Sequence, residues 1–393
     1  MRPYTRVYAS VDLDAIEANM KAMAANLTEG TAVMGVVKTD GYGHGAVPVA
    51  KAIAPYVEAY AVAAVEEAVN LRKHGITKPI LVLGVTHERH NEELIRYDIR
   101  SAVFKKSQAL SLARTARALG RTAGVHLALD TGMSRIGMTV CEESADLSAE
   151  ICAMEGIRVE GIFTHFARAD ETDKACARKQ LAEYLDFIKM LERRGIHIPI
   201  KHVSNSAGIV DMKEANCGMV RAGISIYGLY PSGEVAKEQV LLRPAMELKS
   251  SVTYIKTISE GTAVSYGGTF VASKPMVVAT VPVGYGDGYP RSLSGKGRVL
   301  IRGKSAPILG RVCMDQMMVD ITEISEAEED DQVTLIGRDG GEQITVEELA
   351  ALSGGFHYEI VCGIGKRVPR VYTRGGEIVG KKDYFDDPYD DFR

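Results

Sequence analysis

The sequence lacks the features that would place it in several specialised classes of protein. Its six cysteines lie far apart and form no C-x-x-C pair, which fits reduced thiols better than a disulfide framework or a zinc site. No span of about 20 apolar residues is present, and no apolar segment of the kind found in signal peptides follows the first residues. We therefore expect a cytoplasmic protein with no membrane partner and no bound metal.

An excess of charge of one sign is also missing. The chain has 47 Lys plus Arg against 51 Asp plus Glu, a formal net charge of −4, so no global basic field would attract nucleic acid. Its 393 residues, 46% of them hydrophobic and 25% charged, are typical of a soluble chain that buries a sizeable core. Chemistry on small molecules is the expected function.

Short apolar runs alternate with amphipathic stretches over the first 230 residues. The runs cover residues 32–37, 60–65, 80–85, 101–104, 125–129, 159–164, 200–204 and 219–226. Helical spacing of apolar residues lies between most of them, for example over residues 173–194. Eight strands with intervening helices predict an α/β fold with a (β/α)8 barrel of the TIM type, and a doubly wound open sheet is the alternative.

The pattern changes near Arg243 to short strands separated by Gly-rich turns. Strand-like runs cover residues 252–258, 276–283, 298–301, 318–321 and 332–336. Thr345 and Glu348 have the spacing of a capping box and predict one helix there. We predict a barrel over residues 11–243 and a mostly-β domain over residues 244–393, which the N-terminal strand within residues 1–10 joins.

Several polar residues follow the predicted barrel strands, where barrel enzymes carry their active sites. Lys38 ends the first apolar run and precedes the Gly-rich segment up to Gly45. Burial there would lower the pKa of an ammonium group and make the amine nucleophilic. A lysine that extends from the barrel rim into solvent is the alternative.

Four further loops carry polar residues of the same kind. The loop of residues 130–137 contains Arg135, which suits a carboxylate, and His165 follows the sixth strand. Residues 204–206 come after the seventh strand and residues 220–224 lie around the eighth, where barrels usually bind phosphate. Taken singly, each segment also fits a surface loop or a structural histidine.

The second half contains three segments in which Tyr, Gly and Asp gather. They are residues 265–269, 284–289 and 313–316, and such segments form either binding loops or hairpin turns. No Ser/His/Asp or Cys/His arrangement supports Cys313 as a nucleophile. His87 and His90 are three residues apart on an expected exposed helix, which favours a solvated face over a metal site.

Together these segments resemble the alanine racemase family, and the similarity runs from Val11 to Tyr372. The segment from Lys38 to Gly45 is similar to the family signature for attachment of pyridoxal 5'-phosphate (PLP). The resemblance implies PLP as cofactor, a small amino acid as substrate and a homodimer in which Tyr266 reaches the neighbouring active site.

The resemblance also implies roles for individual residues. Lys38 would form the Schiff base with the cofactor, and Lys38 and Tyr266 would be the two catalytic bases. The cofactor-binding residues would be Lys38, Tyr42, His165, Ser206, Arg221, Gly223, Ile224 and Tyr358. Arg135 and the backbone of Met314 would bind the substrate carboxylate, and Tyr285 would line the corridor by which substrate enters.

The function implied is a PLP-dependent racemase that interconverts L-alanine and D-alanine by a two-base mechanism and supplies D-alanine for peptidoglycan. A serine or broad-specificity racemase on the same scaffold is one alternative, and a non-catalytic PLP-binding protein is another. The sequence departs from the family at Ala128, where many members carry a carbamylated lysine that orients the arginine corresponding to Arg135. Support for Arg135 must then come from elsewhere.

Overall fold

The computed structural model describes residue 4 and residues 6–383. The last ten residues of the expected β domain, 384–393, lie outside this part. Contacts within the chain define two compact units. One comprises Ala15–Gly41 and Ala46–Pro244, and the other comprises Met1–Asp14, Tyr42–Gly45 and Ala245–Arg393. The sequence-based boundary at residues 243 and 244 stays a prediction.

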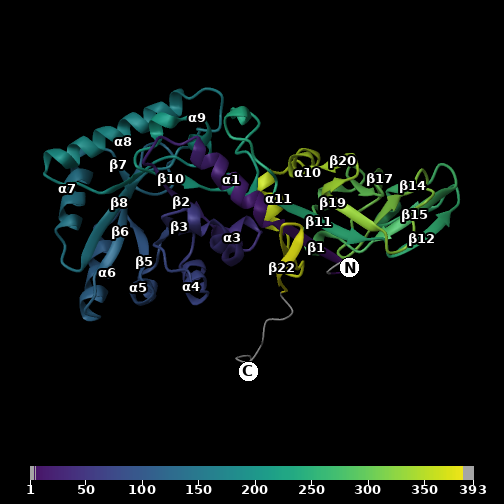
Figure 1. Cartoon of the computed structure of the whole chain (residues 1–393), viewed down its shortest axis with the longest axis horizontal. Coiled ribbons are helices and arrows are strands. Elements are labelled where there is room, and N and C mark those ends of the chain that lie inside the picture. The colour runs from purple at the N-terminus through teal and green to yellow at the C-terminus, as the bar shows by residue number, and fades with distance from the viewer. Residues whose placement is uncertain (1–3, 5, 384–393) are drawn as a thin grey trace. The chain divides into compact units, whose positions relative to one another are not determined.

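Parallel strands close into a barrel in the first unit, which confirms the expected fold class (Figure 1). The strands are β2 (Ala32–Val36), β3 (Ala59–Val62), β4 (Ile80–Val82), β5 (Ile99–Val103), β6 (Ala123–Asp130), β8 (Ile157–Phe163), β9 (Ile200–His202) and β10 (Met219–Ala222). Their order is β5-β4-β3-β2-β10-β9-β8-β6, and pairing of β5 with β6 completes the ring. Each of the eight runs predicted from the sequence overlaps one of these strands.

Helices precede or connect the barrel strands and bury apolar residues. They are α1 (Leu13–Ala25), α3 (Ala46–Ile53), α4 (Val65–Lys73), α5 (Asn91–Arg96), α6 (Lys106–Ala118), α7 (Glu142–Cys152), α8 (Ala175–Arg193) and α9 (Ser206–Asp211). In α8 the buried residues Leu181, Tyr184 and Ile188 recur at three- and four-residue spacing, as a helix packed on a sheet requires. The Tyr184 hydroxyl donates to the carbonyl oxygen of Ile162 at 2.9 Å and ties α8 to β8.

The second unit is built on a mostly antiparallel sheet. Its strands are β1 (Val7–Asp12), β11 (Met246–Ser251), β12 (Tyr254–Ile258), β15 (Met276–Val281), β16 (Arg298–Ile301), β17 (Lys304–Leu309), β18 (Met317–Asp320), β19 (Gln332–Asp339), β20 (Glu342–Ile344), β21 (Arg370–Arg374) and β22 (Glu377–Lys382). A separate hairpin joins β13 (Ala263–Val264) and β14 (Phe270–Val271). β1 pairs with β11 and with β21, so the first strand of the chain lies inside this sheet.

Two local predictions for this unit have different outcomes. The helix expected near Thr345 is α10 (Val346–Ser353), and the Thr345 hydroxyl accepts the amide of Glu348 at 3.0 Å, so this prediction is confirmed. The strand expected over residues 252–258 is wrong at its start, because residues 252 and 253 lie between β11 and β12 and belong to neither strand. A further helix, α11 (His357–Gly363), was not expected from the sequence.

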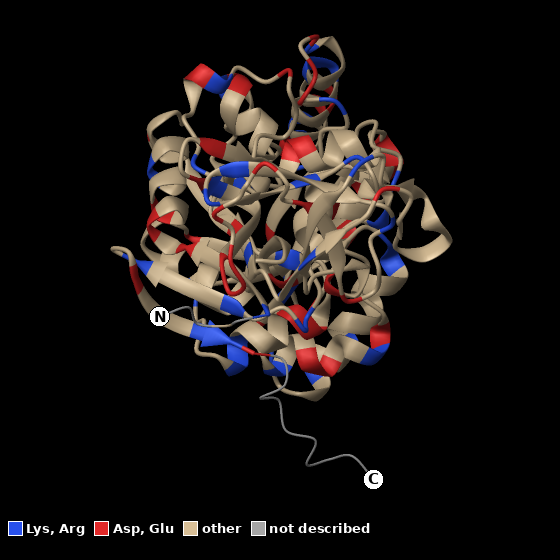
Figure 2. Ribbon diagram, turned by 90° about the vertical axis from the view of Figure 1, so that its right-hand side faces the viewer, with Lys and Arg blue, Asp and Glu red and all other residues tan. Residues whose placement is uncertain are grey.

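The distribution of charged residues and the composition of the helices can be compared with the expectations from the sequence. Basic and acidic residues are interspersed over the ribbon drawn in Figure 2, which agrees with the absence of a strongly basic field. Among the described residues, no helix combines the length and apolar composition needed to cross a bilayer.

Candidate active site

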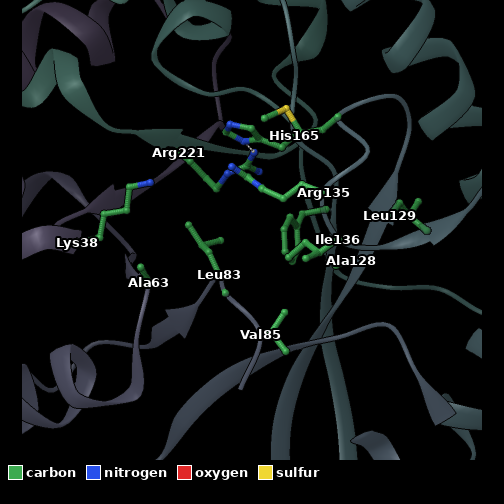
Figure 3. Close-up of a pocket in the computed structure, with 13 residues that line it drawn as sticks. Lys38, Ala63, Leu83, Val85, Ala128, Leu129, Arg135, Ile136, His165 and Arg221 are labelled. Atoms are coloured by element: carbon green, nitrogen blue, oxygen red, sulfur yellow. Dashed lines mark hydrogen bonds between the residues drawn. The ribbon is translucent and has the colours of Figure 1, made fainter. Parts of the chain in front are cut away.

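A cavity of about 350 Å³ opens among the loops that follow the barrel strands. Its lining is mixed, with charged side chains and an apolar set from neighbouring strands. The lining residues are Lys38, Ala63, Leu83, Gly84, Val85, Ala128, Leu129, Met133, Arg135, Ile136, Phe163, His165 and Arg221. Four predicted site residues therefore share one cavity, and Figure 3 shows the Lys38 amine pointing into it.

Arg221 is the most firmly held charge in this cavity. It lies on β10 and is fully enclosed, with 3% of its surface exposed. Its two terminal nitrogens donate to carbonyl oxygens of His202, Val203 and Thr164 at 2.8–2.9 Å. Within the described part of the chain, its Nε–H has no acceptor. One donor of a fixed guanidinium is thus left for a group in the cavity.

Histidines around Arg221 are held in their neutral form. Arg221 contacts Nδ1 of His202 at 2.9 Å and Nδ1 of His165 at 3.2 Å, and His202 in turn contacts His126 at 2.8 Å. Burial, followed by the positive charges of Arg221, Arg135 and Lys38, lowers the pKa of His165 to about 3. Burial also lowers the pKa of His126 to about 4 and that of His202 well below its usual value. Neutral imidazoles can accept hydrogen bonds from the arginine.

This arrangement makes stability depend on pH. In the unfolded chain a histidine binds a proton below about pH 6.5, whereas folded His126 stays neutral down to about pH 4. Because the unfolded state takes up protons first, the free energy of unfolding should fall by about 2 kcal/mol between pH 8 and pH 5 for His126 alone. Urea unfolding followed by circular dichroism measures this, with the exposed His197→Gln as control. A His126→Gln variant with an unchanged pH slope would contradict the prediction.

Arg135 presents a charge to the cavity without a protein partner. It follows Ser134, whose backbone is held by a hydrogen bond from its amide to Asp130 at 2.9 Å. In the described part of the chain Arg135 makes no hydrogen bond or ion pair. Ala128 contributes only a methyl group to the same cavity, so no side chain at that position orients the guanidinium. Arg135 is therefore available to an anionic ligand.

Three of the residues predicted to hold a phosphate, Ser206, Gly223 and Ile224, belong to the same unit as Arg221. Ser206 is the first residue of α9, and its hydroxyl accepts the amide of Gly223 at 2.9 Å. Ile224 begins the short 3-10 helix η4 (Ile224–Tyr227). In the second unit, Tyr42 and Tyr358 lie with ring centres 6.1 Å apart. The structure thus brings these residues together in two groups, one in each unit.

The second unit carries a further concavity of about 730 Å³. It is lined by Ser265, Tyr266, Gly267, Cys313, Met314, Asp315 and Gln316. Tyr266 is 69% exposed and Met314 53% exposed, which is unusual for large apolar side chains. Ser265 has a φ of 67°, and its hydroxyl donates to the carbonyl oxygen of Arg311 at 2.6 Å, which holds the turn before Tyr266.

A buried carboxylate organises the loops beside this concavity. Asp287 is 1% exposed, is hydrogen-bonded to Arg6, and accepts from Nε of Arg367 at 2.8 Å. Burial alone would raise its pKa, but hydrogen bonds from Arg6, the Gly284 amide and Arg367 outweigh burial and lower the pKa. The backbone amide of Tyr285 donates to the carbonyl oxygen of Cys313 at 3.0 Å. Tyr285 and the Met314 segment are therefore fixed to each other.

Some residues of the sites were missed by the sequence analysis. The sequence alone indicates no role for His202, which lies within the seventh apolar run, or for Asp287, which lies within the segment of residues 284–289. Glu67 was not singled out at all. His87 is exposed and caps the short 3-10 helix η2 (Glu88–His90), and the half-buried His90 contacts Glu93 at 2.7 Å. Within residues 4 and 6–383, no group of three or more His, Cys, Asp or Glu is placed to hold a metal ion.

Fold and site together define a barrel enzyme with a lysine at the strand ends and a second, β-rich unit. Comparison with known proteins narrows this class. Residues 11–231 match the family model "Alanine racemase, N-terminal domain", and residues 245–372 match "Alanine racemase, C-terminal domain". The chain belongs to the alanine racemase family.

Relatives and solved structures cover almost the full length. The chain is 44% identical to an alanine racemase of Clostridium perfringens strain SM101, over 96% of this chain and 98% of the relative. It is similar to the structure of alanine racemase from Clostridium difficile 630, with a TM-score of 0.94, 40% identity, and 98% and 100% of the two chains covered. The alanine racemase from Bacillus anthracis with bound L-Ala-P has a TM-score of 0.93 at 35% identity, with 99% and 100% covered.

Proposed function

We propose that this protein is a PLP-dependent racemase that interconverts L-alanine and D-alanine and so supplies D-alanine for peptidoglycan. The observation that carries the proposal is a barrel cavity that both Lys38 and Arg221 line. The Nε–H of Arg221 is left for a ligand there. Membership of the alanine racemase family supports the same reaction.

The residues of the barrel unit fit PLP. Lys38 is an amine that points into the cavity, and the Ser206 hydroxyl beside the Gly223 amide suits a phosphate. The remaining donor of Arg221 suits a ring nitrogen. When bound, PLP supplies an electron-accepting ring that makes the α-proton of an attached amino acid acidic. His165 and Ile224 of the same unit complete this part of the proposed cofactor site.

Arg221 controls the protonation of the group that it contacts. Burial lowers its pKa to about 10, which still leaves it protonated at neutral pH. It therefore donates a hydrogen bond to a ring nitrogen without giving up its proton. A nitrogen held unprotonated withdraws electrons less strongly, which limits protonation at atoms other than Cα. Arg221 thus favours racemisation over transamination.

Racemisation needs a base on each face of Cα, and we assign Lys38 to one face and Tyr266 to the other. Arg135 and the backbone amide of Met314 bind the substrate carboxylate. Tyr266 and Met314 come from the β-rich unit, where both are strongly exposed. We propose that a homodimer brings Tyr266 of the partner subunit to the barrel cavity, and that Tyr285 lines the approach. Tyr266 and Met314 line one concavity, and a group of exposed apolar side chains is more typical of an interface than a single one.

The proposal is tested by incubating the purified protein with PLP and L-alanine, then separately with L-serine, and measuring the D-enantiomers by chiral chromatography. We expect D-alanine to form until the two enantiomers are equal. Faster conversion of serine would assign the protein to the serine or broad-specificity alternative. PLP binding without conversion of either amino acid would contradict a racemase.

A further inference from the structure

The turn that follows Lys38 has an uncommon backbone conformation. The four residues that follow the lysine have φ values of 55°, 49°, 64° and 51°, at Thr39, Asp40, Gly41 and Tyr42. Only one of them is a glycine, and a left-handed conformation is costly for the other three. Such a turn persists only where surrounding contacts determine it.

The side chain of Glu67 supplies one of these contacts. Glu67 lies in the first turn of α4, and its Oε1 accepts the backbone amide of Thr39 at 2.5 Å. Its other oxygen, Oε2, accepts the amides of Ala63 and Ala64 at 2.8 Å and 3.2 Å. To cap α4, Glu67 would need only the hydrogen bonds from the amides of Ala63 and Ala64. The bond to Thr39 reaches back 28 residues and is not required by the helix.

Glu67 therefore joins the ends of two neighbouring barrel strands. Strands β2 and β3 pair in parallel, with Val36 opposite Ala61. The turns that follow them carry Lys38 and Ala63, and both residues line the cavity. One carboxylate thus fixes the peptide directly after the lysine to the rim of the next strand. The other end of the turn is held by Asp40, whose Oδ1 accepts the Ala46 amide at 2.9 Å.

We infer that Glu67 is a positioning residue that aims the Lys38 amine into the cavity by holding the Thr39 amide. This inference rests on the proposed function of Lys38 as the PLP-binding lysine and base. Glu67 does not line the cavity, so it acts through the turn. Its loss should affect proton transfer and attachment of PLP, both of which need the amine in place, more than binding of the substrate carboxylate.

The variant Glu67→Gln tests the inference with little change in volume. An amide has one acceptor oxygen, and its nitrogen cannot accept an N–H group, so Thr39 or Ala63 must lose its acceptor. Glu67→Asp keeps the charge with a shorter reach and serves as the second variant. The matched control is Glu66→Gln, because Glu66 lies next to Glu67 on α4 and, among the described residues, its carboxylate pairs with His90 alone, at 3.8 Å.

Three measurements on the full-length protein are needed. The first is the rate at which PLP, added to cofactor-free protein, forms its covalent bond with Lys38, followed by visible absorbance. The second is amide hydrogen exchange at Thr39. The third is kcat and KM for L-alanine. We expect Glu67→Gln to slow the covalent bond and lower kcat by about 10- to 100-fold, as a displacement near 1 Å would.

In the same variant KM should change by less than about twofold, since uniform binding is kept, and exchange at Thr39 should be faster. Glu67→Asp should fall between Glu67→Gln and the wild type, and Glu66→Gln should match the wild type. Unchanged rates of PLP attachment and unchanged Thr39 exchange in Glu67→Gln would overturn the inference. A wild-type protein that attaches PLP at Lys38 but racemises nothing would instead refute the proposed function.

Discussion

Replacement of Lys38 by alanine should lower the rate of alanine racemisation by more than about 10⁴-fold, the upper end of the effect of one acid–base group. The loss should be that large because Lys38 has two proposed tasks, attachment of PLP and proton transfer on one face of Cα. In the described part of the chain it is the one lysine among the residues that line the cavity. No neighbouring amine can replace it there.

The experiment compares Lys38→Ala with Lys51→Ala, which removes an exposed lysine of α3. These two variants and the wild type are saturated with PLP, treated with borohydride and mapped by mass spectrometry. The wild type and Lys51→Ala should carry the reduced cofactor on the peptide that contains Lys38. An adduct on a different lysine in the wild type would refute the assignment.

The same variant also tests whether the active site is shared between subunits. Inactive Lys38→Ala and inactive Tyr266→Phe proteins should regain activity after subunit exchange, because some mixed dimers contain one intact Lys38 facing one intact Tyr266. Exchange can be verified with differently tagged subunits. If exchange takes place and no activity returns, Tyr266 does not act on the barrel of the partner subunit.

The barrel could be predicted from the sequence because its strands are almost wholly apolar. Most residues of these strands are buried, as in β10, where all four residues are buried and Arg221 is the one charge. The β-rich unit was harder to predict. Strand β11 contains Lys249, Ser250 and Ser251, all buried. Lys249 is accommodated because its Nζ donates to Thr334 at 3.1 Å and to Arg338 at 2.9 Å, a pairing that local pattern cannot indicate.

The candidate site likewise contains residues that could be predicted from the sequence and residues that could not. Lys38, Arg135, His165 and Arg221 could be placed in one cavity because each follows or ends a parallel strand, and such ends meet at one face of a barrel. The contribution of Glu67 could not be predicted, since it depends on left-handed backbone at Thr39 and Asp40. Neither residue type marks that conformation as glycine does. The neutral histidines around Arg221 likewise depend on burial, which the sequence does not reveal for single residues.

Replacement of Tyr266 by phenylalanine should reduce racemisation in both directions by at least about 10²- to 10⁴-fold. The substitution keeps the ring and removes the oxygen, so PLP and alanine should still bind. Because a catalyst cannot change the equilibrium between enantiomers, a loss on one face slows the overall reaction from either side. Tyr254→Phe is a matched control, since Tyr254 is an exposed tyrosine of the same unit, on β12. It should leave the rate unchanged.

Exchange of the α-hydrogen in heavy water separates the two bases. We assign removal of the α-proton of L-alanine to Tyr266 and of D-alanine to Lys38. In Tyr266→Phe, D-alanine should therefore exchange its α-hydrogen with retention of configuration, because Lys38 can take and return a proton on its own face. L-Alanine should exchange very slowly, because its face has lost the base. Rapid exchange from L-alanine alone would reverse the assignment, and equal exchange from both enantiomers would rule out a two-base mechanism.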